Sequence, residues 1–348
     1  MSSVQSKNQI NAFNGRDEQP SPGRKVLGVA GGTAAGFAMF KVSNIPMKAY
    51  GKSFFENLDK FTPQEQEQLI DEAHKMAEQS GLKEKGFNGI VLIEQPKINL
   101  IESIDFNGVK AEDVEPSKWK RLSVNEALQE IDKGVADKAK NGSFTDKFKI
   151  KFSRVAAELQ KISQILIGNV RKDNLKDGIQ LGCFESISNK VFGGRASSLL
   201  HEVGHAMNRN GTLLTKTPQN LMFISRGLLI PAAIITAVFT LKPKNSESNS
   251  DEKSFKTKVK EFTHKHIGLT IVGLSTPLLY EEASASLRAV NFAKKSTVLS
   301  DSVKRQHSKA LKLAYGSYLL SIGALAGITQ VVVAVKDKIQ TSKSKKDD

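Results

Sequence analysis

Two histidines four positions apart, with a glutamate directly after the first, are the residues of this chain best suited to chemistry. They form the motif His201-Glu202-Val203-Gly204-His205. On a helix, positions i and i+4 share a face, so both imidazoles can reach one metal ion. The glutamate then lies beside a metal-bound water. Because the chain has only six histidines, a chance match is improbable, and the motif predicts a zinc (Zn2+) site with Glu202 as general base.

A third ligand is needed, because catalytic zinc is held by three protein ligands and keeps one position open for water. The metzincin pattern does not supply it, since Asn208 and Gly211 stand where its glycine and its third histidine belong. The remaining histidines lie in sequence contexts that do not point to a metal: His74, His264, His266 and His307. The other class of zinc site takes a carboxylate from a second helix.

Adjacent glutamates, Glu281 and Glu282, follow an apolar run and open a helical pattern. Neighbours on a helix differ by about 100°, so only one of them can bind the same ion as the motif. Glu282 precedes the small residues Ala283 to Ser286, which permit close approach to the motif helix, and it is the predicted third ligand. Glu281 is then either a support for the ligands or solvated. Both carboxylates could equally be ordinary charges at a helix N-terminus.

The charge and the aromatic content of the chain indicate which kinds of partner it could bind. The net charge is +15 and the pI is about 9.6, with Lys and Arg spread over most of the length. One Trp and four Tyr offer few rings for stacking on bases, so nucleic acid is not expected, and attraction to anionic membrane lipid is favoured. The single cysteine, Cys183, excludes an intramolecular disulfide and any multi-cysteine metal site. We expect it to be a small buried apolar residue.

The first half of the chain contains a tail, an anchor and a mixed region. Residues 1–24 are polar and predicted to be disordered. Residues 25–41 are predicted to be an N-terminal membrane anchor with Gly28, Gly32 and Gly36 on one face, although as a helix they are short for a bilayer. Residues 42–177 form a mixed α/β elaboration. Its predicted helices are 63–80, 124–142 and 152–167, and its predicted strands are 89–93 and 98–101.

The second half, residues 178–336, carries the motif and three apolar segments. Residues 179–191 predict a strand pair or edge strand, followed by the motif helix over 196–209. The apolar segments are 221–241, 267–280 and 313–335, the last long enough to span a bilayer alone. A soluble enzyme with buried core helices is the alternative, and it is competitive for 267–280. The loop over 242–265 is expected to be flexible, and residues 337–348 to be a basic disordered tail.

About 160 residues at the C-terminal end resemble the YugP-type membrane zinc metallopeptidases. The resemblance depends on Gly182–Asn189, on Leu199–Ala206, and on a pattern that runs from Thr276-Pro277 through Glu282 to Ala289. It also includes Arg226, Pro231 and Leu313-Ala314-Tyr315. The family is gluzincin-like, which implies a Glu third ligand at Glu282. Ser284 stands where the family usually has Asp, so any supporting role of that carboxylate is absent here.

The resemblance and the segments together predict an α+β fold, mostly helical, with a zincin-like metallopeptidase core and several hydrophobic, transmembrane helices. The expected function is that of a multi-pass membrane zinc endopeptidase acting on a peptide or protein substrate. The alternatives are an inactive or non-enzymatic membrane protein with a structural zinc, and a zinc hydrolase that cleaves another bond. Lys- and Arg-rich tails and the 242–265 loop favour an extracytoplasmic catalytic face.

Two further expectations concern catalysis. The candidates for stabilising the oxyanion are Tyr280, Arg288, His264 and His266. Arg288 fits the family pattern best, but it could equally orient Glu281 or Glu282. A strand over 183–187 would bind extended peptide by backbone pairing, as edge strands do in β-augmentation.

Overall fold

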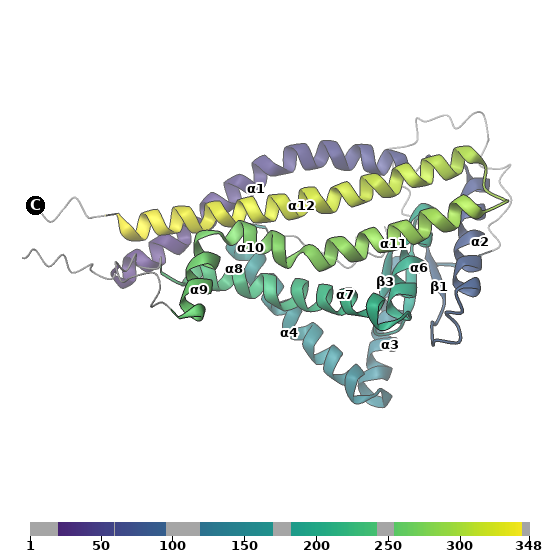
Figure 1. Ribbon diagram of the computed structural model, residues 1–348, viewed down its shortest axis with the longest axis horizontal. Helices are drawn as coiled ribbons and strands as arrows, with labels where there is room; N and C mark the ends of the chain where they lie inside the picture. Colours follow the sequence, from purple (N-terminus) through teal and green to yellow (C-terminus); the bar gives the residue numbers. More distant parts are fainter. Residues whose placement is uncertain (1–19, 59, 95–118, 170–181, 242–253, 343–348) are drawn as a thin grey trace, which may run out of the picture.

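A computed structural model describes residues 20–58, 60–94, 119–169, 182–241 and 254–342. The molecule is mostly helical and elongated, with a small mixed sheet at one end (Figure 1). The predicted mostly helical α+β character is therefore confirmed. The strand predicted over 98–101 and most of the N-terminal tail lie outside the described residues.

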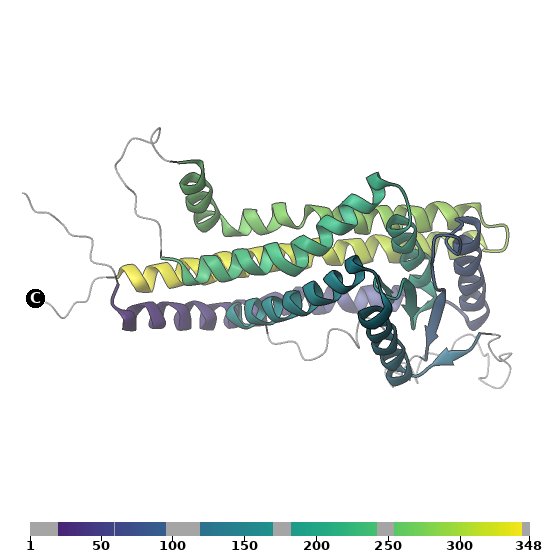
Figure 2. The same ribbon diagram turned by 90° about the horizontal axis from the view of Figure 1, so that it is seen from below.

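The longest elements are two helices that lie side by side along the molecule. Helix α1 (Pro22–Leu58) packs antiparallel against α12 (Asp301–Thr341) (Figures 1 and 2). The regularly spaced glycines explain the close approach: a Cβ at Gly32 would lie 2.7 Å from the Val332 carbonyl oxygen. Both helices outrun their predicted segments, because α12 begins at the Ser300 cap and continues into the expected basic tail. At 1.5 Å per residue, α12 is about 60 Å long.

A third long rod comprises α7 (Leu213–Ile224), the π-turn η2 (Ser225–Leu229) and α8 (Ile230–Phe239). Pro231 stands at the start of α8 and has no N–H to continue the regular pattern. The backbone widens just before it, and the Ile230 N–H donates to the carbonyl of Ser225, five residues back. The rod therefore bends without breaking.

The chain returns through α9 (Phe255–Lys265), α10 (Ile267–Leu274) and α11 (Thr276–Lys295). The prediction of one apolar helix over 267–280 is wrong: α10 ends at Leu274, and Pro277 lies in the first turn of α11, where its missing N–H is tolerated. The expectation of a flexible loop through 265 is wrong over α9, which begins at the Ser254 cap.

Three helices of the described residues are long and apolar enough to cross a membrane. They are Pro22–Gly51, Leu213–Phe239 and Asp301–Thr341. The eight-residue α10 is not among them. The expectation that segment 267–280 is a membrane-spanning helix of its own is therefore not met.

The sheet lies at one end of the molecule, with α2 (Pro63–Gln79) and α3 (Val124–Asn141) beside it, and α4 (Phe144–Leu166) runs from this region to the bundle. The strands of the sheet are β1 (Ile90–Ile93), β2 (Arg121–Leu122), β3 (Cys183–Glu185) and β4 (Lys190–Gly193), in the order β2-β1-β4-β3. Strand β3 is at the edge and pairs antiparallel with β4, as the predicted strand pair requires. Helix α4 begins earlier than predicted, because Ser143 and Asp146 form a capping box.

The motif helix, α6 (Ala196–Arg209), has the predicted bounds and follows directly on β4. Its Leu199, Leu200, Val203 and Ala206 are fully buried in the main core, with residues of α2 and α11. This packing fixes the helix against both neighbours. A functional group on α6 is therefore held by the best-packed part of the molecule.

Candidate metal centre

Helix α6 presents both histidines on one face, and both side chains are buried. The Nε2 atoms of His201 and His205 lie 3.1 Å apart. Helix α11 brings Glu282 to the same point, with Oε2 at 3.1 Å from Nε2 of His201 and 3.5 Å from Nε2 of His205. The structure thus brings together the three residues predicted as ligands, and they form one buried group able to hold a metal ion.

The spacing can be compared with coordination geometry. In a tetrahedral site with bonds of about 2.0–2.1 Å, neighbouring ligand atoms are about 3.3–3.4 Å apart. The three observed separations, 3.1, 3.1 and 3.5 Å, lie on either side of that value. The donor set therefore fits a small divalent cation.

Close contact between α6 and α11 makes this convergence possible. A Cβ at Gly204 would lie 2.6 Å from the carbonyl oxygen of Ala285 and 2.9 Å from its Cα. These are backbone atoms and cannot yield easily, so any residue larger than glycine would push the helices apart. The small residues of both helices therefore determine whether Glu282 reaches the histidines.

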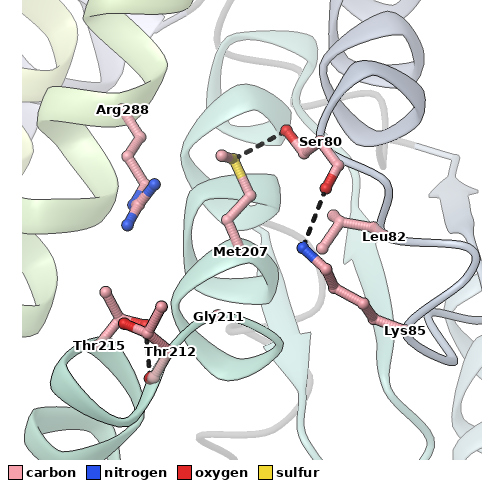
Figure 3. Close-up of a pocket in the computed structure, with 8 residues that line it drawn as sticks. All are labelled: Ser80, Leu82, Lys85, Met207, Gly211, Thr212, Thr215 and Arg288. Carbon is pink, nitrogen blue, oxygen red and sulfur yellow. Dashed lines mark hydrogen bonds between the residues drawn. The ribbon is translucent and has the colours of Figure 1, made fainter.

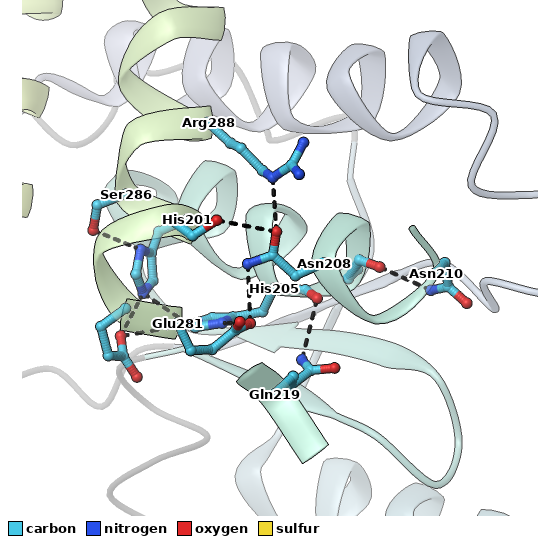
Figure 4. A network of polar contacts seen from close by, with 11 residues as sticks. His201, His205, Asn208, Asn210, Gln219, Glu281, Ser286 and Arg288 are labelled. Atoms are coloured by element: carbon cyan, nitrogen blue, oxygen red, sulfur yellow. Dashed lines mark hydrogen bonds and ion pairs between the residues drawn. The ribbon is translucent and has the colours of Figure 1, made fainter. Parts of the chain in front are cut away.

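The second nitrogen of each imidazole also has a partner (Figure 4). Nδ1 of His205 lies 3.0 Å from Oε1 of Glu281, which has no exposed surface. Nδ1 of His201 lies 3.1 Å from the Ser286 hydroxyl. Such partners fix the tautomer and the ring orientation of metal-binding histidines. Of the two alternatives for Glu281, the structure places it as a support for His205 and not in solvent.

A chain of polar contacts continues from Glu281 towards the surface (Figure 4). The Asn208 amide donates to Glu281 Oε1 at 3.1 Å, and Arg288 Nε donates to Asn208 Oδ1 at 2.7 Å. The Ser284 hydroxyl also donates to Asn208, at 3.3 Å. Sequence reasoning missed Asn208 and Ser286. The helical spacing of Asn208 from His201 and His205 was the available signal.

Three carboxylates, those of Glu202, Glu281 and Glu282, are buried with the two imidazoles. Burial raises the pKa of Glu202. Burial alone would lower the pKa of His205, but the carboxylates of Glu282 and Glu281 raise it well above 6.5. Burial would likewise raise the pKa of Glu282, yet His205 and His201 bring it well below its usual range. Such a concentration of buried negative charge is costly unless a cation offsets it. The charge of this site therefore favours binding of a divalent cation.

Comparison with known proteins gives no relative. No protein-family model, curated protein or solved structure matches this chain.

Glu202 is held from the side of the sheet. Its carboxylate accepts a hydrogen bond from the backbone N–H of Phe184 in the edge strand β3. Gly182, with φ of +139°, precedes that strand, and a Cβ there would lie 3.3 Å from Cγ of Glu202. A glycine at this position therefore lets the strand pass close to the proposed base.

None of the four predicted oxyanion donors faces the three ligands. Arg288 turns away into a pocket of about 230 Å³, with Met207 and Thr215 (Figure 3). Tyr280 is 57% exposed. His264 contacts Thr240 and Asp337 at the far end of the bundle, and the ring centroid of His266 lies 5.0 Å from that of Phe262 in α9. These positions leave Arg288 as a residue that orients Glu281 through Asn208.

Helix α12 supplies two residues to which the sequence assigned no role. The Tyr318 hydroxyl is hydrogen-bonded to Glu282. His307 is fully buried beside His201 and Ser197. A tyrosine inside an apolar segment was the only signal for the first of them. Cys183 is half-buried, and burial, with Glu202 and Glu185 nearby, raises its pKa to about 12, so its thiol is unsuited to nucleophilic chemistry.

Proposed function

We propose that this protein is a membrane-associated, zinc-dependent peptidase in which Glu202 acts as general base. The observation that carries the proposal is the convergence of His201, His205 and Glu282 at tetrahedral spacing, with a hydrogen-bonding partner behind each imidazole. Two imidazoles and one carboxylate are a donor set of catalytic zinc sites, which keep a fourth position for water.

A zinc ion bound there would lower the pKa of its water and polarise the scissile carbonyl. Glu202 takes the proton of that water and passes it to the leaving amine. The raised pKa of Glu202, caused by burial, favours its holding the proton between these two steps. The Phe184 N–H keeps the carboxylate oriented.

Tyr318 is the described residue best placed to donate a hydrogen bond to the developing oxyanion, because its hydroxyl already reaches Glu282. The peptide would lie along β3, whose outer edge is paired with no other described strand. Because proline removes the N–H that orients Glu202 and also distorts the edge of β3, Phe184→Pro should reduce peptide turnover without releasing zinc. Unchanged turnover would remove β3 from substrate binding.

Membrane association is supported by the three candidate spans, and the resemblance to YugP-type metallopeptidases points to the same class. The start of α1, with Arg24 and Lys25, and the last turns of α12, with Lys338, meet at the end of the bundle opposite α6, where Arg24 donates to the carbonyl of Ser342. By the positive-inside tendency this end faces the cytoplasm and the metal centre faces outward. Protection of the metal-centre end from added protease in intact cells would reverse this orientation.

The decisive experiment measures zinc content and casein cleavage in purified wild-type, Glu202→Gln and Glu282→Ala proteins. Glu202→Gln should retain zinc and lose turnover by about 10²–10⁴-fold, the usual contribution of general acid–base catalysis. Glu282→Ala should lose both. Glu78→Gln, an exposed carboxylate on α2, is the matched control and should change neither. Equal cleavage by wild type and Glu202→Gln would exclude the mechanism, and retained zinc without any wild-type cleavage would indicate a structural site.

A further inference from the structure

A basic pocket lies on the side of the molecule where α4 and α7 begin. Its volume is about 340 Å³, and it is also bordered by the end of α6 and the turn between β3 and β4. Four cationic side chains are among the described residues that line it: Lys138, Lys149, Arg209 and Lys216. The one carboxylate in that lining is Asp146. All five side chains are half-buried, so the pocket concentrates positive charge in a site partly withdrawn from water.

The charges are close enough to affect one another. Burial, together with the positive charge of Arg209, lowers the pKa of Lys149, and Asp146 offsets this only in part. Burial likewise lowers the pKa of Arg209. An anion in the pocket would relieve this repulsion, and a phosphate group suits a mixture of Arg and Lys donors.

An aromatic row leads away from the pocket along α4 and α7. Phe148, next to Lys149, is 59% exposed, and its ring centroid lies 6.3 Å from that of Phe152. The ring of Phe152 lies 5.1 Å from that of Phe223 on α7. Further along, α4 packs closely against η2, where a Cβ at Gly227 would lie 2.9 Å from Cβ of Ala156. The row therefore runs from a charged mouth to an apolar end.

The pocket also lies at the boundary of a candidate span. Lys216 is in the first turns of Leu213–Phe239, and Phe223 is two turns further in. At the other end of α4, Leu166 packs with Ile230 and Ile234 of the same span. The cations therefore stand at the level of lipid headgroups and the rings at the level of acyl chains.

We propose that this pocket binds the phosphate of an anionic phospholipid, whose acyl chain lies along Phe148, Phe152 and Phe223. The site is separate from the metal centre and has its own chemistry, recognition of a phosphodiester and a hydrocarbon chain together. An acidic peptide segment would match the charge of the pocket but not the aromatic row.

The test is native mass spectrometry of the full-length protein in dodecyl maltoside with added phosphatidylglycerol or phosphatidylcholine. Wild type should retain phosphatidylglycerol in preference to phosphatidylcholine. Lys149→Gln with Lys216→Gln should weaken phosphatidylglycerol retention by roughly tenfold or more, since each surface cation contributes several-fold to binding an anionic lipid. Lys294→Gln with Lys295→Gln, exposed at the end of α11, removes the same charge elsewhere and should have no effect.

Two further arms separate a lipid from other anions. Glycerophosphate should compete poorly, and Phe148→Ser should weaken retention of the lipid but not of glycerophosphate. Equal binding of glycerophosphate and lipid, or displacement of the lipid by an acidic peptide, would overturn the lipid assignment. Equal retention of the two lipids by wild type would overturn the site. Zinc content should be the same in every variant, so failure here is distinguishable from failure of the proposed peptidase function.

Discussion

Two buried polar clusters, one at each end of the bundle, use similar residues in different ways. At the far end, His264 has a partner for both ring nitrogens: Nδ1 lies 3.2 Å from the Thr240 hydroxyl and Nε2 lies 2.9 Å from Asp337. Lys336 pairs with the same carboxylate at 2.8 Å and donates to the carbonyls of Ala237 and Thr240. Every ring nitrogen there is used within the protein, and a buried cation meets the carboxylate.

At the metal centre, the two imidazoles use only their Nδ1 atoms to bind supporting groups. Their Nε2 atoms and Glu282 Oε2 converge on one another, with two more carboxylates close by. The far-end cluster balances its own charge and needs nothing added, whereas the near cluster has excess negative charge and convergent lone pairs. Histidine burial by itself is therefore no sign of function. The informative feature is that several possible metal-ligand atoms, here two Nε2 atoms and one carboxylate oxygen, converge on one point.

The largest effect on folding should come from the far end. Asp337→Ala leaves Lys336, which has no exposed surface, without its carboxylate, and loss of one partner of a buried pair costs about 3–5 kcal/mol. The midpoint of thermal unfolding in detergent should fall accordingly while zinc content per folded protein stays unchanged. Asp301→Ala, an exposed carboxylate at the start of the same helix, is the control. Loss of zinc in Asp337→Ala would mean that the two ends are coupled.

The largest effect on metal binding should come from the near end. Glu282→Ala should weaken zinc affinity by roughly 10²–10³-fold, the share of one ligand in a typical zinc binding free energy. His264→Ala removes a buried histidine that also contacts a carboxylate and should leave affinity unchanged. Competition with a chelator measures the zinc affinity of both variants. If His264→Ala weakened zinc binding as much, the distinction between the two clusters would fail.

How much of this could be predicted from sequence differs between elements. The bounds of α6 and the capping of α2 and α3 follow from local signals, and they are confirmed. The meeting of Glu282 with the histidines depended on the small residues around it, and these do make the contact at Gly204. Local signals could not show that α1 and α12 continue beyond their apolar segments, since their polar ends are held by packing against each other. Nor could they show that Asn208, Ser286 and Tyr318 surround the ligands, because each is an ordinary residue until the fold brings it there.

The metal centre should also respond to pH, in its stability and in its zinc affinity. Carboxylates raise the pKa of His205 well above 6.5, so in zinc-free protein its pairing stabilises the fold fully below pH of about 6.5 and is lost as pH rises through the folded pKa. Zinc needs the neutral ring, so its affinity should rise over the same range, by up to about tenfold per pH unit for each proton released. With rising pH, the stability of the zinc-free protein should therefore fall while its zinc affinity rises. Both slopes should flatten in Glu282→Gln and persist in His264→Ala, as measured by unfolding and zinc titration between pH 6 and 9. Parallel slopes would show that His205 does not bind the metal.

The smallest effect on zinc binding should come from Arg288, the outermost residue in the chain of contacts that runs from His205 through Glu281 and Asn208. Replacement of a group that supports a metal ligand typically costs 10–100-fold in metal affinity or activity, which is the expectation for Glu281→Gln. Arg288 acts one residue further out, through Asn208, so Arg288→Gln should weaken zinc binding by only a few-fold, and turnover at saturating zinc should change little. Arg305→Gln, on α12, is the charge-matched control. The alternative is an arginine that stabilises the oxyanion, and it makes the opposite prediction: turnover would fall by about 10²-fold or more with zinc affinity intact. Because the two roles move different quantities, this single variant decides whether Arg288 belongs to the support of the metal or to the chemistry at the substrate.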